Sequence, residues 1–384
     1  MTGKAGDVIV VGGGIIGLAS AWRLSLAGAR VTLFDPAPGS GATRAAAGML
    51  APVTEAHYGE EELLRLNLES MAAWPAFASE LEQQSGLEVG YDRSGTLAVG
   101  YDPSDKAALD ELWRFQQKLG LESSPLSASA CRSLEPALSP SIRGGLDVPT
   151  DHQVDPRQVG AALLEACQRA RVSIRHERVE SLLVERARVT GLRTGEAREE
   201  RAPTVVLAAG WRSGEIAGIP PGLRPPVRPV KGQVIRLRLD ERLPRPARTI
   251  RALVRGSFVY LVPRRGGELV CGATSEEMGA DSRVTAGAVY QLLRDAQAVY
   301  PSILEAELAE AITGFRPGSP DNAPLVGPGG MAGLVVATGH FRHGILLAPV
   351  TALIVAELVS SGLGEGWERR PAIDPRRFSR RAGR

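Results

Sequence analysis

The stretch DVIVVGGGIIGLASAWRLSLAGARVTLFD, residues 7–35, decides the fold. Residues 8–11 are β-branched without polar alternation, which is typical of a strand buried on both faces of a parallel sheet. Residues 15–27 have helix-forming composition, and residues 30–34 read as a second strand that ends at Asp35. The order strand, glycine turn, helix, strand predicts a βαβ unit at the start of the chain.

The glycines of this stretch fit the spacing G-x-G-x-x-G at Gly12, Gly14 and Gly17. The first glycine permits a tight turn, the second lets a pyrophosphate approach bare backbone, and the third lets helix and strand pack closely. A phosphate there meets the free N–H groups of a helix N-terminus, and Asp35 suits a ribose diol and disfavours the 2′-phosphate of NADP. The motif therefore predicts a dinucleotide site rather than an ordinary turn, with NAD and FAD both left open.

The composition describes a globular chain with two domains. Its 384 residues exceed the size at which one core keeps growing, and 43% are hydrophobic and 23% charged. The net charge of +2 gives no pull toward nucleic acid, and no run of about 20 apolar residues predicts a membrane span. The three cysteines form no C-x-x-C pair and residues 1–6 lack signal-peptide features. We expect a soluble cytoplasmic protein without nucleic-acid or membrane partners.

Hydrophobic periodicity divides the remaining chain between parallel α/β segments and antiparallel strands. Buried runs at 205–209 and 333–338 read as further parallel strands, and the alternating segments at 172–195, 228–239 and 257–274 as antiparallel ones. Residues 144–156 look irregular. Helical spacing is expected at 60–83, 105–119, 159–171 and 345–362. The pattern predicts an α/β fold with two interleaved domains.

Several segments together resemble one enzyme family, the D-amino-acid oxidase and glycine oxidase family, most closely its glycine oxidases of the thiamine pathway. Besides residues 8–35, they are ATRAAAGMLAP at 42–52, PTVVLAAGWRS at 203–213, PVKGQVI at 229–235, YLVPRRGGELVCGAT at 260–274, GFRPGSPDNAPLVGP at 314–328 and ATGHFRHGILLAPVTA at 337–352. The resemblance implies non-covalent FAD. It also implies a Rossmann-like FAD-binding domain with a mostly parallel sheet at 1–84, 150–218 and 312–384, interleaved with an antiparallel-sheet substrate-binding domain at 85–149 and 219–311.

The resemblance implies that FAD contacts a defined set of residues along the chain. A run of small side chains at 45–49 lets backbone lie flat against a flavin ring, although a packed small-residue helix explains it equally well. The loop at 339–344 precedes a helix, whose free N–H groups can stabilise negative charge on the reduced flavin. The implied FAD contacts are Gly12, Gly14, Ile15, Ile16, Gly17, Asp35, Pro36, Ala42, Thr43, Ala47, Gly48, Met49, Val179, Ala209, Gly210, His340, Phe341, Arg342, His343, Gly344, Ile345 and Leu346.

Three side chains are implied on the substrate side of the flavin. Arg316 matches the arginine that binds the amino-acid carboxylate, for which a planar guanidinium provides two parallel bonds. Tyr260 matches a phenol that can donate to the same carboxylate, and Arg342 a further substrate-side arginine. His340 and His343 stand three apart, but no third ligand is evident, so no metal site is predicted.

The implied reaction is oxidation of a small amino acid by FAD and O2 to a 2-oxo acid, ammonia and hydrogen peroxide, in a homo-oligomeric enzyme. Glycine is the expected substrate, with sarcosine and small D-amino acids as alternatives. Ser275 replaces a bulky apolar residue and Phe258 a polar one of the glycine oxidases, which leaves the preferred amino acid open. The sequence also leaves open a dehydrogenase that passes electrons to a quinone, a covalent-flavin enzyme, a nicotinamide dehydrogenase and a non-catalytic FAD-binding protein.

Overall fold

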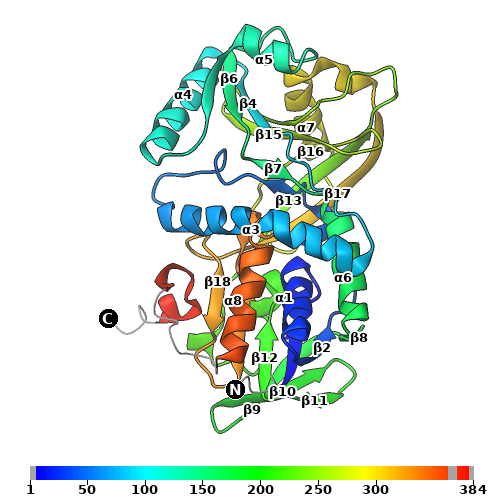
Figure 1. The fold of residues 1–384 in the computed structure, drawn as a ribbon, viewed down its shortest axis with the longest axis vertical. Helices are drawn as coiled ribbons and strands as arrows, with labels where there is room; N and C mark the ends of the chain where they lie inside the picture. Colours follow the sequence, from blue (N-terminus) through cyan, green and yellow to red (C-terminus); the bar gives the residue numbers. More distant parts are fainter. Residues whose placement is uncertain (1–5, 362–369, 380–384) are drawn as a thin grey trace.

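The computed structural model describes residues 6–361 and 370–379. Two large sheets lie one above the other along the long axis of the molecule, and the long helix α3 (Glu61–Ser85) crosses between them (Figure 1). The lower sheet has six strands in the order β18-β19-β12-β1-β2-β8, and the upper sheet has eight in the order β17-β13-β16-β15-β14-β4-β6-β5. The α/β class expected from the sequence is confirmed.

The lower sheet is parallel except at one edge. The strands β1, β2, β8, β12 and β19 pair in parallel, while β18 runs antiparallel to β19. The segment 173–175 therefore does not join the antiparallel meander expected for 172–195. It forms β8 at the edge of the parallel sheet, because residues 32–34 of β2 offer a free edge there. The strands are β1 (Asp7–Val11), β2 (Arg30–Phe34), β8 (Ser173–Arg175), β12 (Thr204–Leu207), β18 (Leu325–Pro328) and β19 (Leu334–Thr338).

Helices cover one face of this sheet and a small meander covers the other. The helices α1 (Ile15–Leu26), α6 (Pro156–Arg169) and α8 (Ala348–Ser360) pack with α3 around the buried Trp22 and Trp74. Asp155 caps α6, as its position before a proline predicts. On the other face lies the three-stranded sheet of β9 (Val179–Glu185), β10 (Arg188–Thr194) and β11 (Glu199–Arg201).

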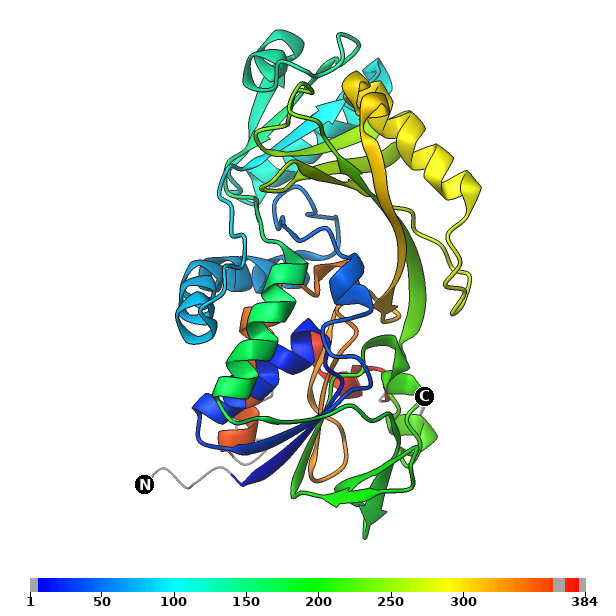
Figure 2. The same ribbon diagram turned by 90° about the vertical axis from the view of Figure 1, so that its right-hand side faces the viewer.

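The upper sheet is mainly antiparallel, with long strands β13 and β17 that reach down toward the lower half (Figure 2). Residues 144–148 form β6 and 152–153 form β7, so the expectation of an irregular segment was wrong; β6 finds partners in β4 and β5, distant in sequence. The strands are β4 (Thr96–Gly100), β5 (Ser124–Ser127), β6 (Gly144–Val148), β13 (Arg228–Arg238), β14 (Thr249–Val254), β15 (Ser257–Pro263), β16 (Glu268–Gly272) and β17 (Glu307–Gly318).

The two faces of the upper sheet have different neighbours. Ile250, Ala252, Val259 and Leu261 belong to a core that includes Leu292 of helix α7 (Ala286–Val299). The alternate residues of β14 and β15 therefore face away from α7, as the period-two alternation of strands requires. The remaining elements are α2 (Ala42–Ala45), α4 (Pro103–Lys118), α5 (Ala128–Leu134), β3 (Met49–Leu50) and β7 (His152–Gln153). Among the described residues, we find no helix with the length and hydropathy needed to cross a membrane.

Candidate active site

One large cavity, of about 850 Å³, extends between the two sheets. Its lower walls come from the β1–α1 turn, from α2 and the residues after it, and from the residues after β12. The other walls come from β13, β14, β15 and β17, from the residues after β16, and from the loop that follows β19. The carboxyl ends of β1 and β12 lie at the lower end of the cavity. This is the edge of a parallel sheet where ligands usually bind.

The glycine-rich turn is packed as its motif predicts. Gly12 has φ +105°, and a Cβ there would lie 2.7 Å from the carbonyl carbon of Ala208. A Cβ on Gly17 would lie 2.9 Å from the carbonyl carbon of Gly12 and closer still to its oxygen, so α1 approaches the turn as closely as backbone allows. Gly17 does not line the cavity. Its role in the structure is the close packing of helix and strand.

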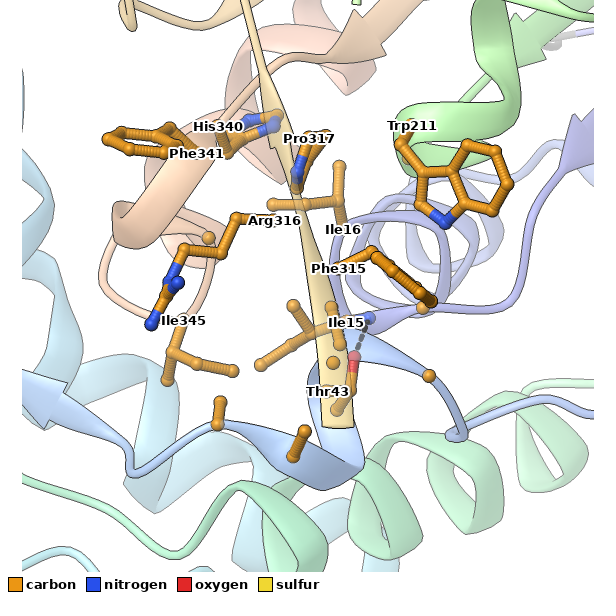
Figure 3. A pocket seen from close by; sticks show the side chains of 18 of the residues that line it. Ile15, Ile16, Thr43, Trp211, Phe315, Arg316, Pro317, His340, Phe341 and Ile345 are labelled. Atoms are coloured by element: carbon orange, nitrogen blue, oxygen red, sulfur yellow. Dashed lines mark hydrogen bonds between the residues drawn. The ribbon is translucent and has the colours of Figure 1, made fainter. Parts of the chain in front are cut away.

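Gly14 has a different environment from the other two glycines. A Cβ there would meet nothing nearer than Thr43 Oγ1, at 3.7 Å, and its φ of −70° suits any residue. Thr43 Oγ1 accepts a hydrogen bond of 3.0 Å from the amide of Ile15, the dashed line in Figure 3. The protein itself leaves room at Gly14 beside the first turn of α1, whose amides have no intrahelical acceptor. This is the cradle that a phosphate would fill.

Asp35 lies at the edge of this cradle. Its Oδ2 accepts a 2.7 Å hydrogen bond from the amide of Gly13, and its Oδ1 one of 2.7 Å from the amide of Ala37. A Cβ on Gly13 would lie 2.9 Å from Cβ of Asp35, so the side chain of Asp35 leaves no room for one at residue 13. The carboxylate is thus fixed against the turn while it lines the cavity.

The loop after β19 brings the buried His340 and free amides to the wall of the cavity. His340 Nε2 lies 3.0 Å from Thr351 Oγ1, and burial lowers the pKa of His340 to about 3. Helix α8 begins at Ala348 rather than at Ile345 as expected, because a 3₁₀ turn at Phe341–His343 carries the chain first. Within the described part of the chain, the amides of residues 344–346 have no acceptor.

At the upper end, two glycines make room for the residues expected to bind substrate. Arg316 on β17 points into the cavity, while its neighbour Phe315 points the other way toward Trp211 (Figure 3). A Cβ on Gly232 would lie 2.5 Å from Nη1 of Arg316, and a Cβ on Gly272 2.6 Å from Cζ of Tyr260. The guanidinium and the phenol therefore lie flat over bare backbone of neighbouring strands.

Tyr260 and Arg316 are half-buried, and a hydrogen bond fixes Arg316 further. Arg316 Nη1 donates to the carbonyl of Thr274 at 3.1 Å. Burial raises the pKa of Tyr260 to about 12, so the phenol stays protonated and can donate. A fixed guanidinium with further N–H groups and a neutral O–H donor on one wall provide the chemistry that holds a carboxylate.

The sequence interpretation missed two residues at this end, Glu55 and Arg251, both of which line the cavity. Arg251 on β14 stands directly opposite Tyr260 of β15 in the antiparallel register. Residues 254 and 257 pair around the two-residue turn Arg255–Gly256, so counting back from this turn would have placed Arg251 beside Tyr260. Glu55 lies in an irregular segment, and no periodic signal marks it.

The buried carboxylate of Glu55 lies beside two arginines and an imidazole. Its carboxylate lies 3.7 Å from Nη2 of Arg251, 4.0 Å from Nε of Arg342 and 3.5 Å from Nδ1 of His343. Burial opposes its charge, but these neighbours outweigh the burial and lower the pKa of Glu55. Burial lowers the pKa of His343 to about 4, so this imidazole is neutral at pH 7.

Most residues implied by the resemblance meet in the cavity. Gly17, His343 and Leu346 do not line it. Leu346 is in the core, and its carbonyl accepts from Ser70 Oγ and Trp74 Nε1. The predicted residues that line it are Gly12, Gly14, Ile15, Ile16, Asp35, Pro36, Ala42, Thr43, Ala47, Gly48, Met49, Val179, Ala209, Gly210, Tyr260, Arg316, His340, Phe341, Arg342, Gly344 and Ile345.

The residues present fit FAD. The lower end offers a phosphate cradle and an acid, and the middle is lined by the small residues of 45–48 and the amides of 344–345. The upper end holds Arg251, Arg316, Arg342 and Tyr260, separate from the cradle. An elongated cavity with a phosphate site at one end and carboxylate-binding groups at the other accommodates a dinucleotide and a small acid together.

Comparison with known proteins agrees with this arrangement. The family model described as FAD dependent oxidoreductase matches residues 7–358. The bifunctional protein ThiO/ThiG of Trichormus variabilis is 34% identical over 357 residues, which are 92% of this chain and 52% of that protein. The chain thus spans about half the length of the ThiO/ThiG proteins that it matches.

Two solved structures are similar over their full length. The crystal structure of glycine oxidase from Geobacillus kaustophilus is 34% identical with a TM-score of 0.85, covering 94% of this chain and 95% of that one. That of iminodiacetate oxidase from Chelativorans sp. BNC1 is 27% identical with a TM-score of 0.84, covering 96% and 98%. From its matched residues and the cavity they build, the chain belongs to the DAO family of FAD-dependent oxidoreductases, and FAD is its cofactor.

Proposed function

We propose that this chain oxidises a small amino acid, most readily glycine, to the 2-oxo acid with release of ammonia and hydrogen peroxide. The observation that carries the proposal is the wall on which Arg316 and Tyr260 lie over Gly232 and Gly272. Relatives named glycine oxidase and ThiO/ThiG support glycine as substrate and a place in thiazole formation for thiamine. We further propose the domain boundaries implied above, a cytoplasmic location and a homo-oligomer.

The residues of the upper end position the substrate. Arg316 and Tyr260 hold the carboxylate, and this fixes the α-carbon between them and the middle of the cavity. FAD, when bound, supplies the acceptor for the two electrons of the α-carbon–hydrogen bond and passes them to O2. An amine that binds uncharged needs no protein base at the α-carbon. Phe258 and Ser275 line the same end and set the room left for a substituent.

Absorbance spectroscopy of the purified holoenzyme tests the proposal. Anaerobic glycine, sarcosine or D-alanine should bleach the flavin, and air should return the colour with one peroxide per amino acid consumed. Acid precipitation should leave the flavin in the supernatant. Bleaching without peroxide would favour the quinone-linked dehydrogenase, and flavin that no amino acid bleaches would favour a non-catalytic FAD-binding protein.

The variant Arg316→Ala tests the carboxylate role directly. Loss of charge-assisted bonds, worth about 3 kcal/mol together, should raise KM for glycine by about 100-fold while the protein stays yellow. Arg238→Ala is the matched control, because Arg238 on β13 is exposed and pairs with Glu307 away from the cavity. Unchanged KM in Arg316→Ala would remove Arg316 from the substrate site.

A further inference from the structure

Arg251 is a cavity residue to which the proposed reaction assigns no task. Its side chain is 9% exposed and lines the same cavity as Tyr260. The pairs Arg251–Tyr260, Tyr260–Gly272 and Gly272–Val234 are in direct register across four strands, so these residues share one face of the sheet. Arg316 is on this face too, opposite Val230 of β13.

Among the residues that line this end of the cavity, arginines outnumber acids. Arg251, Arg316 and Arg342 line the upper end of the cavity, and Glu55 is the acid that lies among them. Arg251 and Arg342 both lie near Glu55, and Glu60, which does not line the cavity, adds negative charge near Arg342. Arg316 faces the α-carboxylate of the proposed substrate. Asp151 adds negative charge near Arg251, but it is fully buried, does not line the cavity and accepts bonds from Val53 and Thr54.

Arg251 retains donors for a ligand. One of its N–H groups donates to the carbonyl of Thr54, and its contact with Glu55 is 3.7 Å, longer than a hydrogen bond. The guanidinium carbon lies 4.9 Å from the centre of the Phe258 ring, so an apolar face supports it. A guanidinium has five N–H donors in a planar fork that matches a carboxylate, and most of these are left over.

The position of Arg251 suits a substrate longer than glycine. The guanidinium of Arg316 lies over Gly232 of β13, and Arg251 arises from β14, three strands away in the order β13-β16-β15-β14. Neighbouring strands are about 4.8 Å apart, which gives roughly 14 Å between these backbones before the side chains lean inward. Glycine held at Arg316 has no second carboxylate to extend toward Arg251.

We propose that Arg251, with Arg342 beside it, forms a second anion subsite. The cavity then accepts an amino acid or N-substituted glycine with a second carboxylate, in addition to the one held by Arg316. The inference rests on the proposed function for its chemistry: the same α-carbon–hydrogen bond is oxidised, and the second carboxylate only binds. The competing interpretation is that Arg251 is a structural partner of Glu55 alone.

The variant Arg251→Gln separates the two interpretations. Glutamine keeps an N–H donor for the Thr54 carbonyl but removes the charge. Arg255→Gln is the matched control, because Arg255 is in the adjoining turn, contacts Tyr101 and does not line this cavity. Binding of succinate and of propionate, which lack an amine to oxidise, is measured on each holoenzyme from the perturbed visible spectrum of FAD.

We expect wild-type holoenzyme to bind succinate more tightly than propionate. Arg251→Gln should weaken succinate binding by about tenfold or more and propionate binding by less than about threefold. In Arg251→Gln, kcat/KM should likewise fall more for iminodiacetate and D-aspartate, which carry a second carboxylate, than for glycine and sarcosine, which do not. Equal losses for both classes in Arg251→Gln, or equal binding of both acids by wild type, would overturn the subsite.

Two further measurements keep the outcome decisive. Arg251→Lys, which retains a positive charge, replaces Arg251→Gln if that variant loses FAD. It should preserve the preference for succinate over propionate. Loss of this preference in a folded, yellow Arg251→Lys would count against the subsite. If no amino acid bleaches the flavin while succinate binding still depends on Arg251, the proposed function fails and the subsite stands. If glycine bleaches the flavin but the two ligand classes respond alike, only the subsite fails.

Discussion

Gly14 and Gly17 belong to the same motif, yet a side chain at each would meet different neighbours. At Gly17 the obstacle is backbone of the turn itself, the carbonyl group of Gly12, whereas at Gly14 the protein leaves open space. A glycine that its own protein does not require indicates a ligand that approaches the backbone there. A substitution at Gly17 therefore tests folding, and a substitution at Gly14 tests cofactor binding.

We expect Gly14→Ala to leave the unfolding of the FAD-free protein within about 0.5 kcal/mol of wild type and to weaken FAD binding strongly. Gly17→Ala should instead destabilise the FAD-free protein itself, by about 2 kcal/mol or more, because backbone cannot move aside cheaply. Urea unfolding of the FAD-free proteins and fluorescence titration with FAD measure the two effects. Normal FAD affinity in Gly14→Ala would contradict the phosphate cradle.

At the scale of elements, neighbouring strands of the upper sheet cooperate to place Arg316. The strand β17 supplies the arginine, and β13 supplies the glycine over which its guanidinium lies. A methyl group on Gly232 would displace the far end of a flexible side chain rather than backbone. The sheet itself should tolerate alanine there, since strands disfavour glycine.

Gly232→Ala should therefore raise KM for glycine by about tenfold or more while the thermal midpoint stays near that of wild type. Gly287→Ala in helix α7 is the control, because a Cβ there meets nothing within 4 Å. Steady-state kinetics and thermal melts of both holoenzymes check this. A Gly232→Ala enzyme with wild-type KM would show that the guanidinium does not need its position over β13.

The loop after β19 should make stability depend on pH. Burial lowers the pKa of His343 to about 4 from about 6.5 in the unfolded chain, so below pH 6.5 the unfolded state binds the proton more readily. Stability is therefore full above pH 6.5 and falls toward pH 4. Between pH 7.5 and 5.5 this histidine alone should cost about 1.4 kcal/mol.

His343→Gln should remove that part of the pH dependence, and His176→Gln, at an exposed histidine, should not. Urea unfolding of the holoenzymes at both pH values gives the comparison. An identical loss in wild type and His343→Gln would mean that His343 is not buried in its neutral form.

At the scale of the whole molecule, the cavity joins the two sheets. Its lower wall belongs to the parallel sheet and its upper wall to the upper sheet, whose long strands β13 and β17 continue from one half toward the other (Figure 2). A ligand that fills this cavity contacts both halves at once. FAD should therefore stabilise the entire fold rather than one part.

We expect FAD at 100 times its Kd to add about 2.7 kcal/mol to the free energy of unfolding of the FAD-free protein. Circular dichroism and intrinsic fluorescence, which report on different parts, should show one transition shifted equally. NAD at the same concentration should have little effect. Two separate transitions, of which FAD moves only one, would contradict a shared cavity.

The sequence alone determined the elements whose signals are local. The run 8–35 fixed the βαβ unit and its phosphate cradle, because apolar runs, glycine spacing and a terminal acid all lie within one short stretch. Arg316 and Tyr260 could be placed only through resemblance to a family, since neither position carries a local signal for carboxylate binding. In the structure they meet on one wall of the cavity.

Only the tertiary structure decided what depends on contacts between distant segments. Residues 173–175 and 144–148 took their places from strands far away in sequence, and Glu55 and Arg251 came together across almost 200 residues. Local propensity cannot encode such pairings, because they follow from which sheet edges and charges remain free when the whole chain packs. The phosphate cradle was therefore readable from the sequence, whereas the charges of the substrate end were not.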